Sequence, residues 1–423
     1  MRRRNLLAGI LALASAVSVA LPGPAVAAWT ATTAAGGTGR SAATSMPAGL
    51  QPSATGSSTG DATAQVSWPP STGGAPVDGY EVLAYDASSG APRAIGASCS
   101  GIVIGTSCTE TGVPDGSWRY SVVPRRLAWA GAESPRSDPA LIDATPPTIS
   151  IGFPSDGGTY SNASWNAGCS SAFCGTAADA ESGVASVYIS VRQGLGNYWD
   201  GAAFASATEV LLGATGTTSW SVALAGISFP ADGTYTATAV ATDFGGGTAS
   251  DATTFTMDRI GPSPTGLTLF NSNGTITPGT DEIRITFSEA LDVGSVCSAW
   301  SGIGDQSLGG SSVVVTITNN GANDVVTVAA GACTLQFGSV ATGRDYVLLT
   351  STFSGSTAGT ESRVTWTAAS RLLVVHLGSQ ASGLANVLPQ AATTVTYTPD
   401  AAITDQVGNA VVTTPFSAGA QRF

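Results

Sequence analysis

The sequence predicts an all-β protein built as three β-sandwiches in series. Its 423 residues include 53 glycines and 22 prolines, a composition typical of many short strands joined by turns. Apolar and polar residues alternate with a period of two, as at Ala64, Val66 and Trp68, which is the spacing of strands with one buried face. No stretch carries an apolar stripe of helical period over the length of a helix.

The chain opens with the pattern of a secretion signal. Arg2, Arg3 and Arg4 precede an apolar run, and Ala25-Val26-Ala27 forms a small-residue cleavage pattern. We therefore expect a signal peptide over residues 1–27, a flexible segment over residues 28–46, and no membrane insertion after cleavage. The expected location is extracellular, either secreted or associated with the cell wall.

The charge is acidic, with 28 Asp and Glu against 16 basic residues and a formal net charge of −12. Cleavage after residue 27 would remove three of the arginines and make the charge more negative still. A negative field repels phosphate backbones and anionic lipid. We therefore expect no nucleic-acid partner.

Six cysteines in an exported chain can pair completely, because the compartment is oxidising. A zinc site needs about four N or S ligands, and the only histidine, His376, lies far beyond the cysteines at 169 and 174. We therefore expect disulfides, with no metal and no cofactor. Three local pairings each stay inside one predicted domain: Cys99 with Cys108, Cys169 with Cys174, and Cys297 with Cys333.

Two proline-rich junctions divide the chain. The segments IDATPPTISI and MDRIGPSPTG each place an aspartate, Asp143 or Asp258, ahead of two prolines. Such junctions stiffen a linker and cannot enter the interior of a sheet. The predicted domains span residues 47–142, 147–257 and 262–423.

The first domain combines the alternation near residue 66 with three aromatic residues in strand-like surroundings. These are Trp68 in AQVSWPP, Tyr80 in VDGYEVLAYD and Tyr120 in GSWRYSVVP. On these residues the domain resembles a fibronectin type III module. It departs from that family in the Cys99 and Cys108 pair and contains no Arg-Gly-Asp tripeptide.

The second domain alternates at Val187, Ile189 and Val191. Its segments FCGTAADAESGVASVYISVR and GTYTATAVATDFGGGTAS resemble a bacterial immunoglobulin-like repeat. The family often has an Asp-x-x-Gly-Asn turn where Asp243 is followed here by Phe-Gly-Gly-Gly. Any role of that asparagine is therefore lost.

The third domain alternates at Ile283, Ile285 and Phe287. It is similar to another immunoglobulin-like class through DEIRITFSEALD and AAITDQVGNAVV, and in the latter Asp405 and Asn409 keep the turn. Together the three resemblances imply a secreted or cell-surface protein of a Gram-positive, actinobacterial-type bacterium. These families serve as spacers and adhesive modules, and they imply no catalytic residues.

The residues give little support for an enzyme. His376 lies in the alternating segment RLLVVHLGS, which predicts a packed or edge histidine, and no G-x-S-x-G elbow precedes a predicted helix. A pair of carboxylates could hydrolyse glycosides, but acids such as Asp179, Glu181, Glu289, Asp292 and Asp405 fall in turns, where carboxylates commonly accept backbone hydrogen bonds. We therefore expect no catalytic residues.

Two binding hypotheses remain beside that prediction. Calcium could join the acids of DAESG and TDQVGN to Asp143 and Asp258, although simple turns explain those acids as well. A ligand surface could form from Trp129, Tyr198 and Trp199, although core packing is the more common role of such rings.

The predicted function is that of a non-enzymatic spacer, adhesive or assembly module. The alternative is an accessory carbohydrate-binding protein of an extracellular polysaccharide-degrading system. The expected partners are a cell-envelope protein or polysaccharide, or further copies of the chain through self-assembly.

Overall fold

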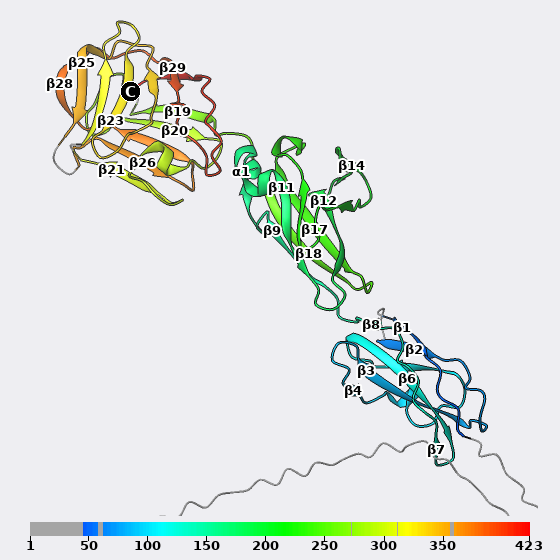
Figure 1. The fold of residues 1–423 in the computed structure, drawn as a ribbon. Helices are drawn as coiled ribbons and strands as arrows, with labels where there is room; N and C mark the ends of the chain where they lie inside the picture. Colours follow the sequence, from blue (N-terminus) through cyan, green and yellow to red (C-terminus); the bar gives the residue numbers. More distant parts are fainter. Residues whose placement is uncertain (1–44, 58–61, 272, 311, 356–358) are drawn as a thin grey trace, which may run out of the picture. The chain divides into compact units, whose positions relative to one another are not determined.

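The computed structural model describes residues 45–57, 62–271, 273–310, 312–355 and 359–423. The prediction of an all-β chain is confirmed, because strands dominate these residues and each of the two α-helices has at most six residues (Figure 1). The predicted signal peptide and almost all of the predicted flexible segment lie outside the described residues.

The first pair of sheets uses strands from Ser53 to Ile142. One sheet has the order β1-β2-β5 and the other β4-β3-β6-β7, with β8 also paired to β6. Pairing of the second strand with the fifth and of the third with the sixth is the arrangement of immunoglobulin-like sandwiches. The strands are β1 Ser53–Ser57, β2 Thr63–Ser67, β3 Gly79–Asp86, β4 Pro92–Arg93, β5 Ser107–Thr111, β6 Gly116–Arg126, β7 Trp129–Ala130 and β8 Ala140–Ile142.

The largely apolar core of this sandwich contains a buried carboxylate. Trp68 and Tyr80 meet edge to face with ring centroids 5.4 Å apart. Glu110, on β5, is fully buried and accepts hydrogen bonds from Arg93 on β4 and from the Tyr120 hydroxyl on β6. This polar contact ties one sheet to the other, because β5 belongs to one sheet and both partners to the second.

The second pair of sheets follows from Thr148 to Met257. The larger sheet has the order β10-β18-β17-β12-β13-β14 with β15 paired to β12, and the smaller has the order β16-β11-β9. The elements are β9 Thr148–Phe153, β10 Thr159–Tyr160, α1 Asn162–Ala167, β11 Ala172–Ala178, β12 Val184–Gln193, β13 Tyr198–Trp199, β14 Phe204–Ser206, β15 Leu212–Gly213, β16 Ser219–Ala223, β17 Gly233–Asp243 and β18 Thr248–Met257.

A short helix supplies the central ring of this core. Ser161 caps α1 by accepting a hydrogen bond from the Ser164 amide, and the Ser164 side chain accepts one from the Ser161 amide in return. The helix thereby places Trp165, which is fully buried and stacks on Phe255 with centroids 5.1 Å apart. The indole Nε1 donates to the Leu224 carbonyl at 2.6 Å.

The third pair of sheets runs from Pro264 to Gln421. The sheet orders are β19-β20-β27-β26-β21 and β28-β25-β22-β23-β24-β29-β30. The elements are β19 Pro264–Phe270, β20 Glu282–Phe287, α2 Val293–Val296, β21 Gln306–Gly309, β22 Val313–Thr318, β23 Val325–Ala330, β24 Ser339–Ala341, β25 Val347–Ser354, β26 Arg363–Thr367, β27 Leu372–His376, β28 Ser379–Ala385, β29 Thr393–Thr398 and β30 Phe416–Gln421.

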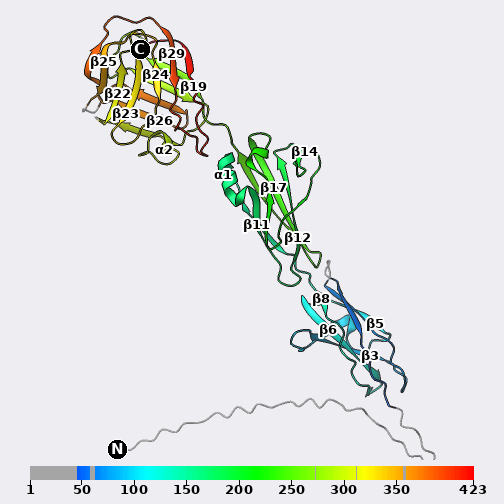
Figure 2. The ribbon, with the colours of Figure 1, turned by 45° about the horizontal axis from the view of Figure 1, so that its top comes forward.

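By its contacts the chain divides into two compact units. Of the described residues, one unit holds those up to Thr148 together with Ala178–Ser186 and Ala241–Ala249, and the other holds the rest. The predicted domain boundaries stay predictions, although each pair of sheets comes from one continuous stretch of chain (Figure 2). Within the described residues, we find no helix with the length and apolar character needed to traverse a bilayer.

Candidate metal centre

Of the predicted aromatic surface, Trp129 alone is substantially exposed. Its side chain is 38% exposed beside Leu127, which is 91% exposed. Both residues line a hollow of about 420 Å³ together with Ala75, Pro76 and Arg126. This arrangement presents an apolar surface at the β6–β7 hairpin.

The other two aromatic residues are less accessible than Trp129. Trp199 is only 6% exposed, so its ring packs into the core of the second sandwich, and the hypothesis of a stacking surface is wrong there. Tyr198 is half-buried, and the Arg192 guanidinium lies over its ring, 5.1 Å from the centroid.

The histidine and the cysteines have structural partners. His376 on β27 is opposite Glu282 on β20, with Nδ1 3.3 Å from the carboxylate. The structure pairs the cysteines locally, and none of the six is free. The disulfides join Cys99 to Cys108, Cys169 to Cys174, and Cys297 to Cys333.

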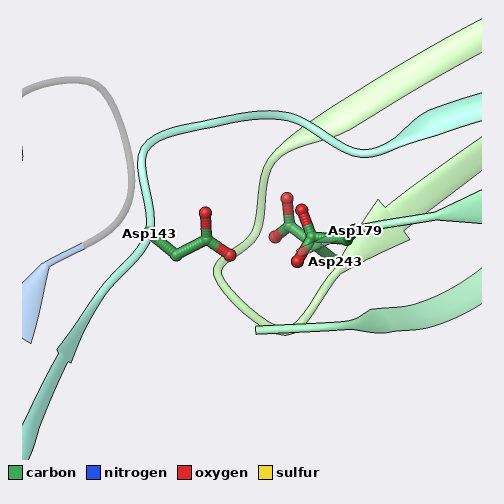
Figure 3. A group of neighbouring side chains, drawn as sticks. All are labelled: Asp143, Asp179 and Asp243. Atoms are coloured by element: carbon green, nitrogen blue, oxygen red, sulfur yellow. The ribbon is translucent and has the colours of Figure 1, made fainter. Parts of the chain in front are cut away.

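Three aspartates from separate segments converge in one place. Asp143 follows β8, Asp179 follows β11, and Asp243 ends β17. One carboxylate oxygen of each lies within 4.8 Å of the corresponding oxygens of the other two. Figure 3 shows the Asp143 carboxylate directed toward the neighbouring carboxylates of Asp179 and Asp243. All three residues belong to the same compact unit.

The turn Asp179–Gly183 positions the second of these aspartates. The Asp179 Oδ1 accepts hydrogen bonds from the amides of Glu181, Ser182 and Gly183, at 3.2, 2.9 and 2.7 Å. Gly183 has a φ of +84°, a conformation that favours glycine. The Ser182 amide also donates to Asp143 Oδ2 at 3.2 Å, so this turn holds two of the three carboxylates.

The turn Asp243–Gly247 positions the third. The Gly247 amide donates to Asp243 Oδ1 at 2.8 Å. A Cβ at Gly247 would lie 2.4 Å from Asp243 Oδ2, so the site requires glycine at this position. The two turns are joined directly, because the Phe244 amide donates to the Gly183 carbonyl at 3.0 Å.

The cluster concentrates negative charge away from solvent. Asp143 is 2% exposed and Asp243 is 3% exposed, and Asp143 Oδ1 and Asp243 Oδ2 have no hydrogen-bond partner among the described residues. None of the ion pairs formed by the described residues involves these aspartates. Two unit charges 4.8 Å apart repel by about 3 kcal/mol at an effective dielectric constant of about 20. A cation bound here would compensate the charge and coordinate the unpartnered oxygens.

A second acidic cluster contains Asp258, Glu289 and Asp405, whose oxygens also lie within 4.8 Å of one another. Partial burial, and then the charges of Asp258 and Asp405, raise the pKa of Glu289 to about 7. The Asp405 carboxylate differs from those of the first cluster because both of its oxygens are bonded. Oδ1 accepts from the amides of Val407 and Asn409, and Oδ2 accepts from the Asn409 side chain.

The calcium hypothesis named two members of each cluster but not the third. Asp143 does approach Asp179, and Asp258 does approach Asp405. Asp243 and Glu289 were missed, because only the folded sheets bring their turns to the other acids. Glu181 of DAESG lies outside the first cluster. The simpler turn interpretation also holds, since Asp179 and Asp405 accept hydrogen bonds from the backbone of their own turns.

No protein-family model matches the chain, and no curated protein matches it. Among solved structures it is similar to the FN1–FN3 domains of chicken CNTN1, with 9% identity over 89% of this chain and 99% of that chain and a TM-score of 0.27. It is similar to a tetra-tandem repeat in the extending region of a large adhesion protein, with 16% identity, coverages of 89% and 99%, and a TM-score of 0.24. For a 1.5-MDa bacterial ice-binding adhesin the identity is 13%, the coverages are 86% and 91%, and the TM-score is 0.28. These similarities assign no residue a role.

Proposed function

We propose that this chain is an extracellular, non-enzymatic modular protein that acts as a spacer or an adhesive through the surfaces of its β-sandwiches. The observation that supports this function is the succession of paired sheets, each drawn from one continuous stretch of chain and each containing its own disulfide. Units of this kind extend a chain without sharing a core. Disulfides persist in the oxidising environment outside the cell.

The acidic residues support a structural role over catalysis. Asp179 and Asp405 accept several backbone hydrogen bonds in their turns, and Asp292 caps α2 by accepting from the Gly294 amide at 3.0 Å. A carboxylate used in this way holds the backbone in place.

Cell fractionation with crosslinking tests the proposed function. We expect the native protein in the wall fraction or the medium, and crosslinked ladders of high molecular weight if the modules assemble. Recovery from the cytoplasm with reduced cysteines would contradict the extracellular assignment. Turnover of a polysaccharide or peptide that a single carboxylate substitution abolishes would contradict the non-enzymatic assignment.

Trp129 supports a second candidate function, binding of carbohydrate. An exposed indole ring beside the apolar Leu127 and Pro76 can stack on the apolar face of a sugar ring. A glycan-binding screen with the full mature chain tests this candidate. Trp129→Ala should abolish binding, whereas Phe244→Ala, which truncates an aromatic side chain that is 74% exposed elsewhere, should not. Equal loss in both variants would refute the candidate.

A further inference from the structure

We propose that Asp143, Asp179 and Asp243 form a Ca²⁺ site that fastens the segment after β8 to the turns that follow β11 and β17. The proposal depends on the proposed function only for the supply of calcium outside the cell. Because binding is measured on the purified chain, failure of the site leaves the spacer or adhesive function standing.

Two unpartnered oxygens indicate a ligand. Asp143 Oδ1 and Asp243 Oδ2 belong to side chains that are 2% and 3% exposed, and neither oxygen accepts a hydrogen bond from the part of the chain that the structure describes. Buried polar atoms nearly always have a partner, and a buried carboxylate needs one more than a neutral group does. Both oxygens belong to residues of the converging cluster (Figure 3), where a single cation can satisfy them together.

The cluster is preorganised around those oxygens. Asp143 Oδ2 accepts from the Ser182 amide, Asp179 Oδ1 accepts from the Gly183 amide, and Asp243 Oδ1 accepts from the Gly247 amide, at 3.2, 2.7 and 2.8 Å. Each carboxylate is therefore oriented through one oxygen by the backbone. Ligands held in this way need little rearrangement when the ion binds.

The chemistry of the donors selects a hard cation. All three side chains offer oxygen and none offers nitrogen or sulfur, which disfavours zinc and copper. Calcium accepts six to eight oxygens at about 2.3–2.6 Å in flexible geometry, so it can bridge oxygens up to about 5 Å apart. The oxygens here lie within 4.8 Å of one another. Magnesium demands nearly ideal octahedral geometry at about 2.0–2.1 Å, which three ligands from separate segments do not readily provide. Backbone carbonyls or water would complete the calcium shell.

The second acidic cluster does not carry the same inference. Both oxygens of its buried member, Asp405, already accept hydrogen bonds. The number of Ca²⁺ ions bound per chain must therefore be measured together with the affinity, so that calcium bound at the second cluster is not mistaken for calcium at the first.

Titration calorimetry of the full mature chain, freed of metal with EDTA, tests the proposal. The key variants are Asp179→Asn and the matched control Asp200→Asn. Asp200 is exposed and, like Asp179, its Oδ1 accepts hydrogen bonds from backbone amides, those of Ala202 and Ala203 at 2.9 and 2.8 Å. Asparagine retains this acceptor oxygen in both turns, so the two variants differ in whether the lost charge belongs to the cluster.

We expect the wild-type chain to bind Ca²⁺ at this site with a Kd on the order of 0.1–1 mM, the range of extracellular modules, and Mg²⁺ at least about tenfold more weakly. Asp179→Asn should bind one Ca²⁺ fewer than the wild type, or bind it at least about tenfold more weakly, while Asp200→Asn should match the wild type. Equal calcium binding by the two variants, or no binding by the wild type at 10 mM, would overturn the proposal.

Thermal unfolding with Asp143→Asn and Asp243→Asn separates a calcium ligand from a merely structural aspartate. In EDTA both variants should unfold at or above the wild-type temperature, because each removes a repelling charge. In 10 mM CaCl₂ the wild type should gain more in Tm than either variant. Variants that are destabilised equally with and without calcium would show that these aspartates act only through their hydrogen bonds.

Discussion

Replacement of Arg93 by methionine should destabilise the first sandwich far more than loss of an exposed arginine. Glu110 is fully buried and accepts two hydrogen bonds from the Arg93 guanidinium, at 2.9 and 2.8 Å. Removing one partner of a buried ion pair costs about 3–5 kcal/mol. Gly96 and Tyr120 still donate to the carboxylate, at 2.6 and 2.8 Å, so we expect a loss near the lower limit, about 3 kcal/mol.

Arg125→Met is the matched control. Arg125 pairs with Glu81 across β6 and β3, but these side chains are 28% and 35% exposed. Partly exposed ion pairs contribute at most about 1 kcal/mol to the free energy of unfolding, so Arg125→Met should lose little stability. Calorimetry of the full chain measures both variants, with hydrogen exchange along β5 identifying the transition of the first sandwich.

The effect of Arg93→Met should also depend on pH. Burial would raise the pKa of Glu110, but hydrogen bonds from Arg93, Gly96 and Tyr120 outweigh it, so the pKa lies below its usual value. The folded state therefore holds the proton less readily than the unfolded chain. This stabilisation is present above about pH 4.5 and is lost as the pH falls further. The difference in the free energy of unfolding between the wild type and Arg93→Met should thus become smaller from pH 7 to pH 4. A constant difference, or an equal loss in Arg125→Met, would refute this reasoning.

Three further variants test the other sandwiches, each by urea unfolding. The pKa of Glu289 is raised to about 7, so protonation of Glu289 stabilises the folded state. This contribution to stability is fully present below about pH 4.5 and is lost as the pH rises through 7. Glu289→Gln should therefore remove a stability difference between pH 5 and pH 8 of about 1 kcal/mol after solvent screening; an unchanged difference would contradict the assignment. Cys297→Ser combined with Cys333→Ser opens a loop with a sequence separation of 36 and should cost about 3–4 kcal/mol, a loss that reduction of the wild type should reproduce. Trp165→Ala removes the centre of an aromatic core and its bond to Leu224 and should cost about 3–5 kcal/mol; a cost below about 1 kcal/mol would exclude a central role.

The strands were predictable because burial follows the sequence period directly. Val66 and Ile285 are fully buried within alternating segments, as expected. Ser190 breaks the pattern: the period places it on the exposed face of its strand, yet it is buried. Its hydroxyl donates to Glu209 at 2.6 Å, a partner 19 residues away that no local pattern reveals.

Helix α1 and the first acidic cluster show where local patterns are insufficient. Six residues are too few to display a helical period, so the signal of α1 is limited to the cap formed by Ser161 and Ser164. Asp143, Asp179 and Asp243 each precede proline or glycine, so the sequence predicts a turn at each of them. It does not predict that Asp243 joins the other two, because that depends on the packing of β17 near the turn after β11, which is a tertiary property.

The disulfide between Cys297 and Cys333 has a consequence for a chain that bears load. If the third sandwich is pulled apart from its ends, the residues between these two cysteines cannot straighten while the bond is intact. A separation of 36 residues corresponds to about 120 Å of extended backbone that tension cannot release. The maximum extension of the protein under tension would therefore depend on whether a reductant in the surroundings has cleaved this disulfide.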